Sequence, residues 1–94
     1  MSNIELYNED CLNWLKNAAN SGTTIDAVVC DLPYFGVVKE EFDNQWTCLL
    51  HYLTWLDECL LYCNRILKKG GNLLIFCSRQ NMWRICKMLH DNGF

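Results

Sequence analysis

Two compact apolar segments on either side of a long amphipathic one place the tightest limit on what this chain can fold into. Ile25–Cys30 and Asn72–Cys77 are short and rich in branched or large apolar side chains. Such segments are typical of strands buried on both faces, and hence of a parallel sheet. Between them, from about Thr47 to Leu67, apolar positions recur every three or four residues, which predicts the longest helix. This order indicates an α/β fold with crossover connections.

The N-terminal part of the chain adds a strand and a helix to this pattern. Asn3–Asn8 alternates apolar and polar residues, which predicts a short strand. Asn8 or Asp10 can then cap a helix that runs through Ala19. The chain as a whole therefore predicts a sheet of about three parallel strands flanked by helices.

The later elements also carry end signals. Lys68 and Lys69 suit the negative C-terminal end of the long helix, and Gly70-Gly71 suits a left-handed cap. Ser78 suits the N-cap of a last helix, which ends at Asn92-Gly93. One side of that helix is expected to be apolar and to hold Met82, Ile85, Cys86 and Leu89.

Composition and charge exclude several classes of protein. The 94 residues are 51% hydrophobic, which fits one small packed domain and excludes a disordered chain. Asp57, Glu58 and Arg65 interrupt the most apolar stretch, so no membrane span is expected. The N-terminus lacks a secretory pattern, which favours the cytoplasm. The net charge of −3 argues against autonomous nucleic-acid binding, which needs a basic face.

Seven cysteines are many for this length, yet their pattern does not predict a metal site. The number is odd, no Cys-x-x-Cys occurs, and the neighbours are apolar, so reduced thiols acting as small hydrophobic side chains are expected. A zinc site built from Cys48, His51, Cys59 and Cys63 fails on distance, because Cys48 and Cys59 would lie about 16 Å apart in one helix. A paired use of Cys59 and Cys63, one turn apart, stays open.

The segment Asp31-Leu32-Pro33-Tyr34 carries the clearest chemistry. It follows a predicted parallel strand, at the end of the sheet where such folds bind ligands. Pro33 restricts Leu32 and leaves backbone carbonyls without a neighbouring donor. The Asp31 carboxylate and these carbonyls could accept hydrogen bonds from an amine on a planar ring, while Tyr34 stacks against that ring. The alternative is a tight turn in which Asp31 only caps the chain.

These residues and their surroundings resemble the amino-methylating DNA methyltransferases, which use S-adenosylmethionine. The resemblance rests on Asp31–Tyr34 after its apolar strand, on Asp43–Trp46, and on Arg65–Phe76. It extends over nearly the whole chain and includes Asp10 after the first predicted strand. The family motif usually has Pro where this chain has Leu32, so one rigid ring is missing from the loop.

The resemblance implies a role for each matched residue. Asp31 with the carbonyl of Leu32 or Pro33 would bind the target amine, and Tyr34 would stack on a base flipped out of DNA. Asp10, together with Asp31, would contact S-adenosylmethionine, although Asp10 also suits a helix N-cap. Asp31 and the Asp43–Trp46 segment favour adenine as the target base. An RNA- or protein-directed methyltransferase remains an alternative, since it shares the same amine-binding logic.

The Gly-rich turn on which the family builds its cofactor site has no counterpart among the five glycines. Residues 1–94 are therefore expected to be a single partial methyltransferase domain that lacks this turn and the target recognition domain, and to be inactive alone. Missing neighbours would leave strand edges exposed, which predicts a homo-oligomer. A non-catalytic oligomeric interaction module stays open as the second interpretation. A restriction-modification or phage origin follows from the resemblance only.

Overall fold

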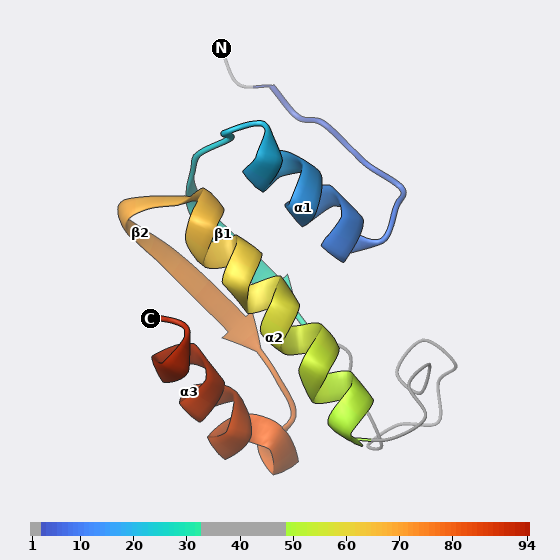
Figure 1. The fold of residues 1–94 in the computed structure, drawn as a ribbon, viewed down its shortest axis with the longest axis vertical. Coiled ribbons are helices and arrows are strands. Elements are labelled where there is room, and N and C mark those ends of the chain that lie inside the picture. The colour runs from blue at the N-terminus through green and yellow to red at the C-terminus, as the bar shows by residue number, and fades with distance from the viewer. Residues whose placement is uncertain (1–2, 33–48) are drawn as a thin grey trace.

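The computed structural model describes residues 3–32 and 49–94. Helices and strands alternate along the chain, as Figure 1 shows. The elements are α1 (Cys11–Asn20), β1 (Ile25–Asp31), α2 (Leu49–Ile66), β2 (Leu67–Phe76), the short 3-10 helix η2 (Arg79–Asn81) and α3 (Met82–Asp91). This order confirms four predicted elements, which are the first helix, the strand at Ile25, the long helix and the last helix.

The centre of the fold is a parallel pair of strands joined through α2. β1 and β2 are hydrogen-bonded neighbours, with Val28 opposite Leu73 and Asp31 opposite Phe76. Parallel neighbours need a long crossover between them, and α2 provides it. The α/β class predicted from the two apolar segments is confirmed for the described residues.

The predicted strand over Asn3–Asn8 does not form. This segment has no regular secondary structure, and its Ile4 and Leu6 side chains are 87% and 92% exposed. Alternating side chains can signal a strand, but a strand also needs a neighbour for its backbone hydrogen bonds. Within the described residues the sheet therefore has two strands and not about three.

β2 begins earlier than predicted. It starts at Leu67, directly after α2 ends at the buried Ile66, so Lys68 and Lys69 lie in the strand and not at a helix end. Gly70 has a φ of +83°, but within β2 and not in a helix cap. The register is irregular here, because Ile25 pairs with Leu67 while Ala27 pairs with Asn72. The two glycines thus serve a bulge at the start of β2.

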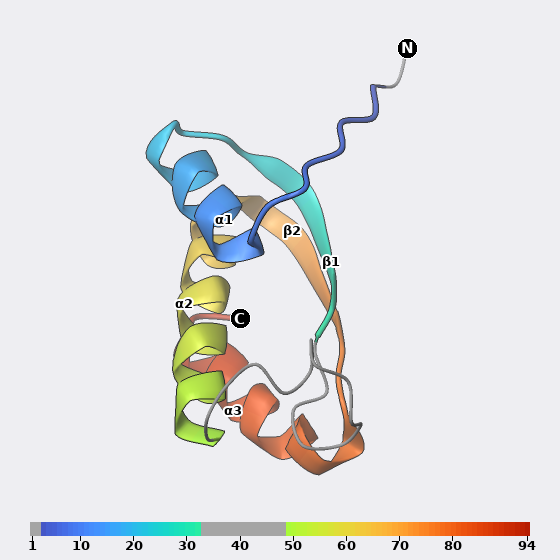
Figure 2. The same ribbon diagram turned by 90° about the vertical axis from the view of Figure 1, so that its right-hand side faces the viewer.

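All three α-helices cover the same face of the sheet, as Figure 2 shows in side view. Two groups of buried side chains fill the space between them. The group near α1 consists of Leu15, Ala18, Cys59, Cys63 and Ile66, and the group near α3 consists of Leu32, Tyr52, Leu56, Leu60 and Ile85. α2 contributes to both groups, so it is the central element of the core.

The opposite face of the sheet is open. Val29, Leu74 and Phe76 on this face are 67%, 49% and 57% exposed. The prediction that both strands are buried on both faces is therefore wrong for the described residues. The cause is that no described element lies over this face, so alternate residues of each strand remain in contact with solvent.

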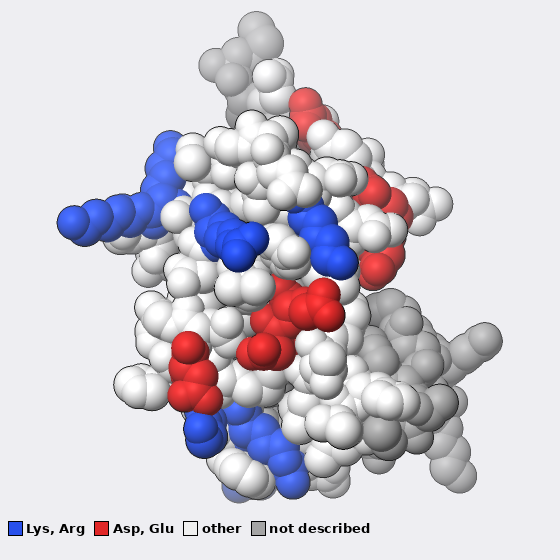
Figure 3. All heavy atoms as spheres, viewed as in Figure 1, with Lys and Arg blue, Asp and Glu red and all other residues white. Residues whose placement is uncertain are grey.

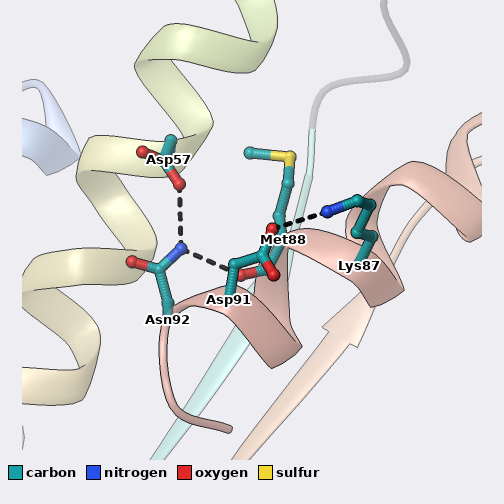
Figure 4. A network of polar contacts seen from close by, with 5 residues as sticks. All are labelled: Asp57, Lys87, Met88, Asp91 and Asn92. Atoms are coloured by element: carbon teal, nitrogen blue, oxygen red, sulfur yellow. Dashed lines mark hydrogen bonds and ion pairs between the residues drawn. The ribbon is translucent and has the colours of Figure 1, made fainter.

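A polar network holds the end of α3 against α2 (Figure 4). The Asn92 side-chain amide donates to Asp57 Oδ1 at 2.8 Å and to the Met88 carbonyl at 2.9 Å, while Asn64 Nδ2 donates to the Asn92 carbonyl at 2.6 Å. Of the apolar side predicted for this helix, Ile85 is buried, whereas Met82 and Cys86 are exposed. In the described part of the chain, none of the helices has the length and apolar character needed to cross a membrane.

Candidate functional site

Asp31 and Leu32 lie where β1 ends. Asp31 is the last residue of the strand, opposite Phe76, and the Leu32 backbone N–H donates to the Phe76 carbonyl at 3.0 Å. The Leu32 side chain is buried with Tyr52 and Leu56. This anchoring holds the end of β1 against α2. Pro33 and Tyr34, and the Asp43–Trp46 segment, lie outside the described residues.

Asp10 stands at the N-cap position of α1. Its backbone is extended, with φ −60° and ψ 129°, and its carbonyl accepts a hydrogen bond from the Trp14 N–H at 3.2 Å. Its side chain makes no capping hydrogen bond to the helix. The position is therefore that of a cap, as one interpretation of the sequence predicted, but the carboxylate oxygens are not used to satisfy the helix.

One cavity brings the two predicted carboxylates together. It has a volume of about 780 Å³ and lies between residues 5–10, α1, the second half of β1, and α2. Asp10, Asp31 and Leu32 all line it. Residues that are distant in the sequence thus share one cavity at the carboxyl end of a parallel strand, which is the usual place for a ligand in such sheets.

Two aromatic rings in the cavity wall were not predicted from the sequence. Tyr7 and Trp14 line the cavity, with ring centroids 5.9 Å apart and ring planes inclined at 53°. The Tyr7 hydroxyl donates to Glu5 Oε2 at 2.7 Å. The available signal was the placement of an aromatic residue on each side of Asp10, which the expected strand over residues 3–8 obscured.

Among the described residues, the charged side chains that line the cavity are all acidic. Glu5, Glu9, Asp10 and Asp31 contribute carboxylates to its lining. On the face shown in Figure 3, Lys and Arg side chains are mixed with Asp and Glu and do not form one basic area among the described residues. The cavity therefore suits a ligand with positive charge better than a phosphate.

Four thiols also belong to the cavity wall, and they occur in pairs. A hydrogen bond from Cys59 lowers the pKa of the Cys11 thiol to about 7, and the same bond raises the pKa of Cys59. In the second pair, a hydrogen bond from Cys63 lowers the pKa of Cys30, and that bond raises the pKa of Cys63. The cavity thus contains both carboxylates and polarised thiols.

Ser78, predicted as the N-cap of the last helix, instead precedes the short helix η2, and its side chain makes no capping hydrogen bond. Ser78 is buried at the start of η2 and accepts a hydrogen bond from Asn81 Nδ2 at 3.1 Å, so its hydroxyl is used within the fold. Across residues 3–32 and 49–94, no group of three or more His, Cys, Asp or Glu side chains is arranged to hold a metal ion.

Comparison with known proteins agrees with these observations. A family model described as DNA methylase matches residues 25–94, so the chain belongs to the DNA methylase family. The resemblance to DNA amino-methyltransferases noted in the sequence is thereby confirmed.

Two curated relatives define the similarity further. The chain is 29% identical to the type II methyltransferase M.HinfI of Haemophilus influenzae, over 90% of this chain and 27% of that protein. It is 33% identical to the type II methyltransferase M.BamHI of Bacillus amyloliquefaciens, over 77% of this chain and 17% of that protein. The chain thus spans about a quarter or less of the length of these relatives. No solved structure matches.

Proposed function

We propose that this chain carries the target-amine site and part of the cofactor site of a DNA adenine methyltransferase that uses S-adenosylmethionine. The observation that supports this proposal is the shared cavity, because Asp10 and Asp31 line it together although they come from different elements. The family membership of residues 25–94 gives the reaction class. DNA is then the substrate of the whole protein.

The cavity residues fit S-adenosylmethionine. Tyr7 and Trp14 offer aromatic faces that can stack on an adenine ring or attract a cation. The carboxylates of Glu9 and Asp10 can accept hydrogen bonds from hydroxyl or ammonium groups. The volume lies in the usual range for cofactor sites. When bound, S-adenosylmethionine supplies an electrophilic methyl group.

Asp31 and the backbone after it act on the target base. The Asp31 carboxylate and the Leu32 or Pro33 carbonyl accept hydrogen bonds from the exocyclic amine of a flipped adenine. With both N–H bonds directed at acceptors, the nitrogen lone pair is available for reaction, and Asp31 can take the proton that the amine loses. Tyr34 stacks on the flipped base, by the resemblance. The preference for adenine rests on Asp31 and on Asp43–Trp46.

Binding measurements test the cofactor site. Titration calorimetry on the chain with S-adenosylmethionine is expected to show weak binding, which Asp10→Asn and Asp31→Asn each reduce by about tenfold, the usual worth of one charged hydrogen bond. Asp26→Asn is the matched control, because Asp26 lies on the same strand as Asp31 but does not line the cavity. No binding by the unaltered chain, or equal loss in the control, would overturn the assignment.

A methyl-transfer assay tests the expected inactivity. Because the sequence has no Gly-rich turn to complete the cofactor site, we expect no transfer of radiolabelled methyl to DNA by the chain alone. Turnover by the isolated chain would show that residues 1–94 suffice for catalysis and would contradict this expectation.

We also infer that the chain associates with copies of itself through the open sheet face. Val29, Leu74 and Phe76 give this face an apolar centre, and the outer edges of the two strands have no partner strand among the described residues. Sedimentation at micromolar concentration should show an oligomer that Leu74→Lys dissociates, whereas Leu50→Lys, at an exposed position on α2, should not. A stable monomer of the unaltered chain would refute the association.

A further inference from the structure

The net charge of −3 conceals a division of the chain into an acidic and a basic part. Residues 1–58 contain ten of the 11 acidic residues and two of the eight basic ones. Residues 59–90 contain no acidic residue and the other six basic ones, which are Arg65, Lys68, Lys69, Arg79, Arg84 and Lys87. Such asymmetry is typical of chains that contact a polyanion, such as nucleic acid or an anionic membrane.

The outer side of η2 and α3 carries three of these basic residues. Ile85 is buried and Leu89 packs against the core, so this side of α3 faces inward. Trp83 and Lys87 lie one turn apart on the other side, and both are exposed, as is Arg79 in η2. In Figure 3, Lys and Arg side chains gather at the end of the molecule that α3 occupies. The basic-aromatic surface is defined by four residues, which are Arg79, Trp83, Arg84 and Lys87.

Trp83 offers a flat ring in the middle of this surface. The Arg84 guanidinium carbon lies 4.5 Å from the centroid of the Trp83 ring, which is the range of a cation–π contact. The Trp83 side chain is nevertheless 64% exposed, so solvent reaches the rest of the ring. A ring held between cations in this way can stack on a nucleic-acid base, since every base has a π-face.

Most of the positive charge on this surface is not neutralised. Among residues 3–32 and 49–94, neither Arg79 nor Arg84 forms an ion pair with a carboxylate. Lys87 contacts Asp91 at 3.0 Å, but its side chain is 71% exposed. The planar guanidinium of arginine matches the geometry of a phosphate group. The surface therefore suits a phosphate backbone, in contrast to the acidic lining of the cavity.

This surface lies next to the end of the sheet that carries Asp31. Phe76 ends β2 opposite Asp31, and Arg79 follows three residues later. The Cα atoms of Asp31 and Arg79 are therefore no more than about 16 Å apart, given the spacing of strands and the reach of an extended chain. In Figure 2 the chain passes from β2 into α3 at this end of the sheet. A strand whose base reaches Asp31 can thus extend over the same surface.

We propose that the basic-aromatic surface binds a DNA strand beside the target base, with its three cations on phosphates and Trp83 stacked on an unpaired base. The choice of DNA among polyanions rests on the proposed function, but the surface itself does not. A membrane is not favoured, because the apolar side of α3 is used in the core. The surface is also separate from the open sheet face, which lies on the other side of the sheet.

Binding of short DNA strands to the full chain tests the phosphate contacts. Fluorescence anisotropy with a labelled thymidine oligonucleotide should give a Kd of about 1–100 µM at ~50 mM salt. Three phosphate contacts predict that the logarithm of the binding constant falls with the logarithm of the salt concentration with a slope of about −2. Arg79→Ala should weaken binding about three- to tenfold and reduce that slope to about −1.4.

Arg65→Ala is the matched control for Arg79→Ala. Arg65 is also exposed, and its guanidinium carbon lies 5.2 Å from the centroid of the Tyr62 ring, but it precedes the start of β2 and so lies at the opposite end of the sheet. This variant should change neither the Kd nor the slope. Equal weakening by the two variants, or no binding by the unaltered chain, would overturn the proposal.

The role of Trp83 is tested with a strand that lacks bases. Trp83→Ala should weaken binding of the thymidine oligonucleotide about fivefold or more, the usual effect of losing one stacked base. Trp83→Phe keeps a ring and should restore most of this loss. Neither variant should change the binding of an abasic oligonucleotide of equal length, because only phosphate contacts remain there. Equal weakening with and without bases would refute the stacking.

Three further outcomes would assign this surface to another ligand and overturn the proposal. One is tighter binding of a matching uridine oligonucleotide, and another is tighter binding to vesicles of anionic lipid. The third is an oligomer in sedimentation that Arg79→Ala dissociates, because the acidic part of a second copy would then occupy the surface.

The proposed function and the DNA-binding surface fail separately. DNA binding that depends on Arg79 and Trp83, in a chain that does not bind S-adenosylmethionine, would contradict the cofactor assignment and leave the surface intact. Cofactor binding in a chain whose DNA affinity is unaffected by both variants would refute the surface and leave the cofactor assignment intact.

Discussion

The two faces of the sheet come from the same strands but differ completely in their surroundings. Val28, Leu73 and Ile75 point to the helices and pack against the core, whereas their neighbours Val29 and Leu74 face solvent. A strand with apolar side chains on both faces is typical of a sheet that has a layer of helices on each face. The difference shows that the described fold supplies only one of the two layers for which its strands are suited.

The largest difference in stability between the two faces is expected from a substitution in the core beneath the helices. Leu56→Ala removes a fully buried side chain and should lower the free energy of unfolding by about 2–5 kcal/mol. Leu74→Ala, the matched change on the open face, should cost less than about 1 kcal/mol. Urea titration of both variants, at a protein concentration too low for the proposed self-association, measures this. Equal losses under these conditions would show that the single chain already covers this face.

The next largest loss of stability is expected at the start of β2, where the register between β1 and β2 is set. A Cβ on Gly71 would lie 2.8 Å from the Asp26 carbonyl oxygen and 2.9 Å from that of Lys68. Because both atoms belong to the backbone, Gly71→Ala should destabilise the chain by about 1–3 kcal/mol. Lys69→Ala, two residues earlier on the same strand, is the control. A neutral Gly71→Ala in urea unfolding would contradict the close approach.

A smaller effect is expected where α3 is fastened over the covered face. Asn92→Ala removes the donor to Asp57 and to the Met88 carbonyl and should cost about 1 kcal/mol. Lys87→Ala breaks only the exposed ion pair with Asp91 and should cost about 0.3–0.5 kcal/mol. Thermal unfolding of both variants orders them. A larger loss for Lys87→Ala would refute the role given to Asn92.

The last prediction probes the cavity on the helix side without changing the fold. Iodoacetamide reacts with thiolates, so alkylation of Cys11 should rise with pH and reach half its maximum near pH 7, where an ordinary thiol needs about 8.5. Cys59→Ala removes the hydrogen bond that lowers this pKa, and the midpoint should move upward. Mass spectrometry of the Cys11 peptide gives the rates. An unchanged midpoint in the variant would contradict the pairing.

The sequence predicted those elements whose signal is local. The apolar segment at Ile25 and the periodic stretch that became α2 both formed within a few residues of their expected ends. The strand expected at Asn3 failed because pairing depends on a neighbour, which no local pattern reveals. β2 was placed too late because Gly70 and Gly71 resemble a helix cap, whereas the pairing of Leu67 with Ile25 extends the strand through them.

The candidate site was predictable only in part, for a similar reason. Asp31 follows from its place at the end of a predicted parallel strand and Asp10 from the resemblance, and the structure brings both to one cavity. The strand expected over residues 3–8 obscured Tyr7 and Trp14, although both lie close to Asp10 in the sequence. The relation of the cavity thiols could not be foreseen, because it depends on how α1 and α2 pack. Motifs identify residues within one segment, whereas a cavity wall is assembled from several.

The pairing of Ile25 with Leu67 also bears on how the chain is made. During synthesis β1 emerges while its partner strand has not yet been translated, and the ribosome adds only about 5–20 residues each second. Until α2 and β2 have emerged, the apolar β1 segment has no native partner, and nonlocal parallel pairing is intrinsically slow. During this interval the apolar β1 segment is exposed to solvent and is available for binding by a chaperone.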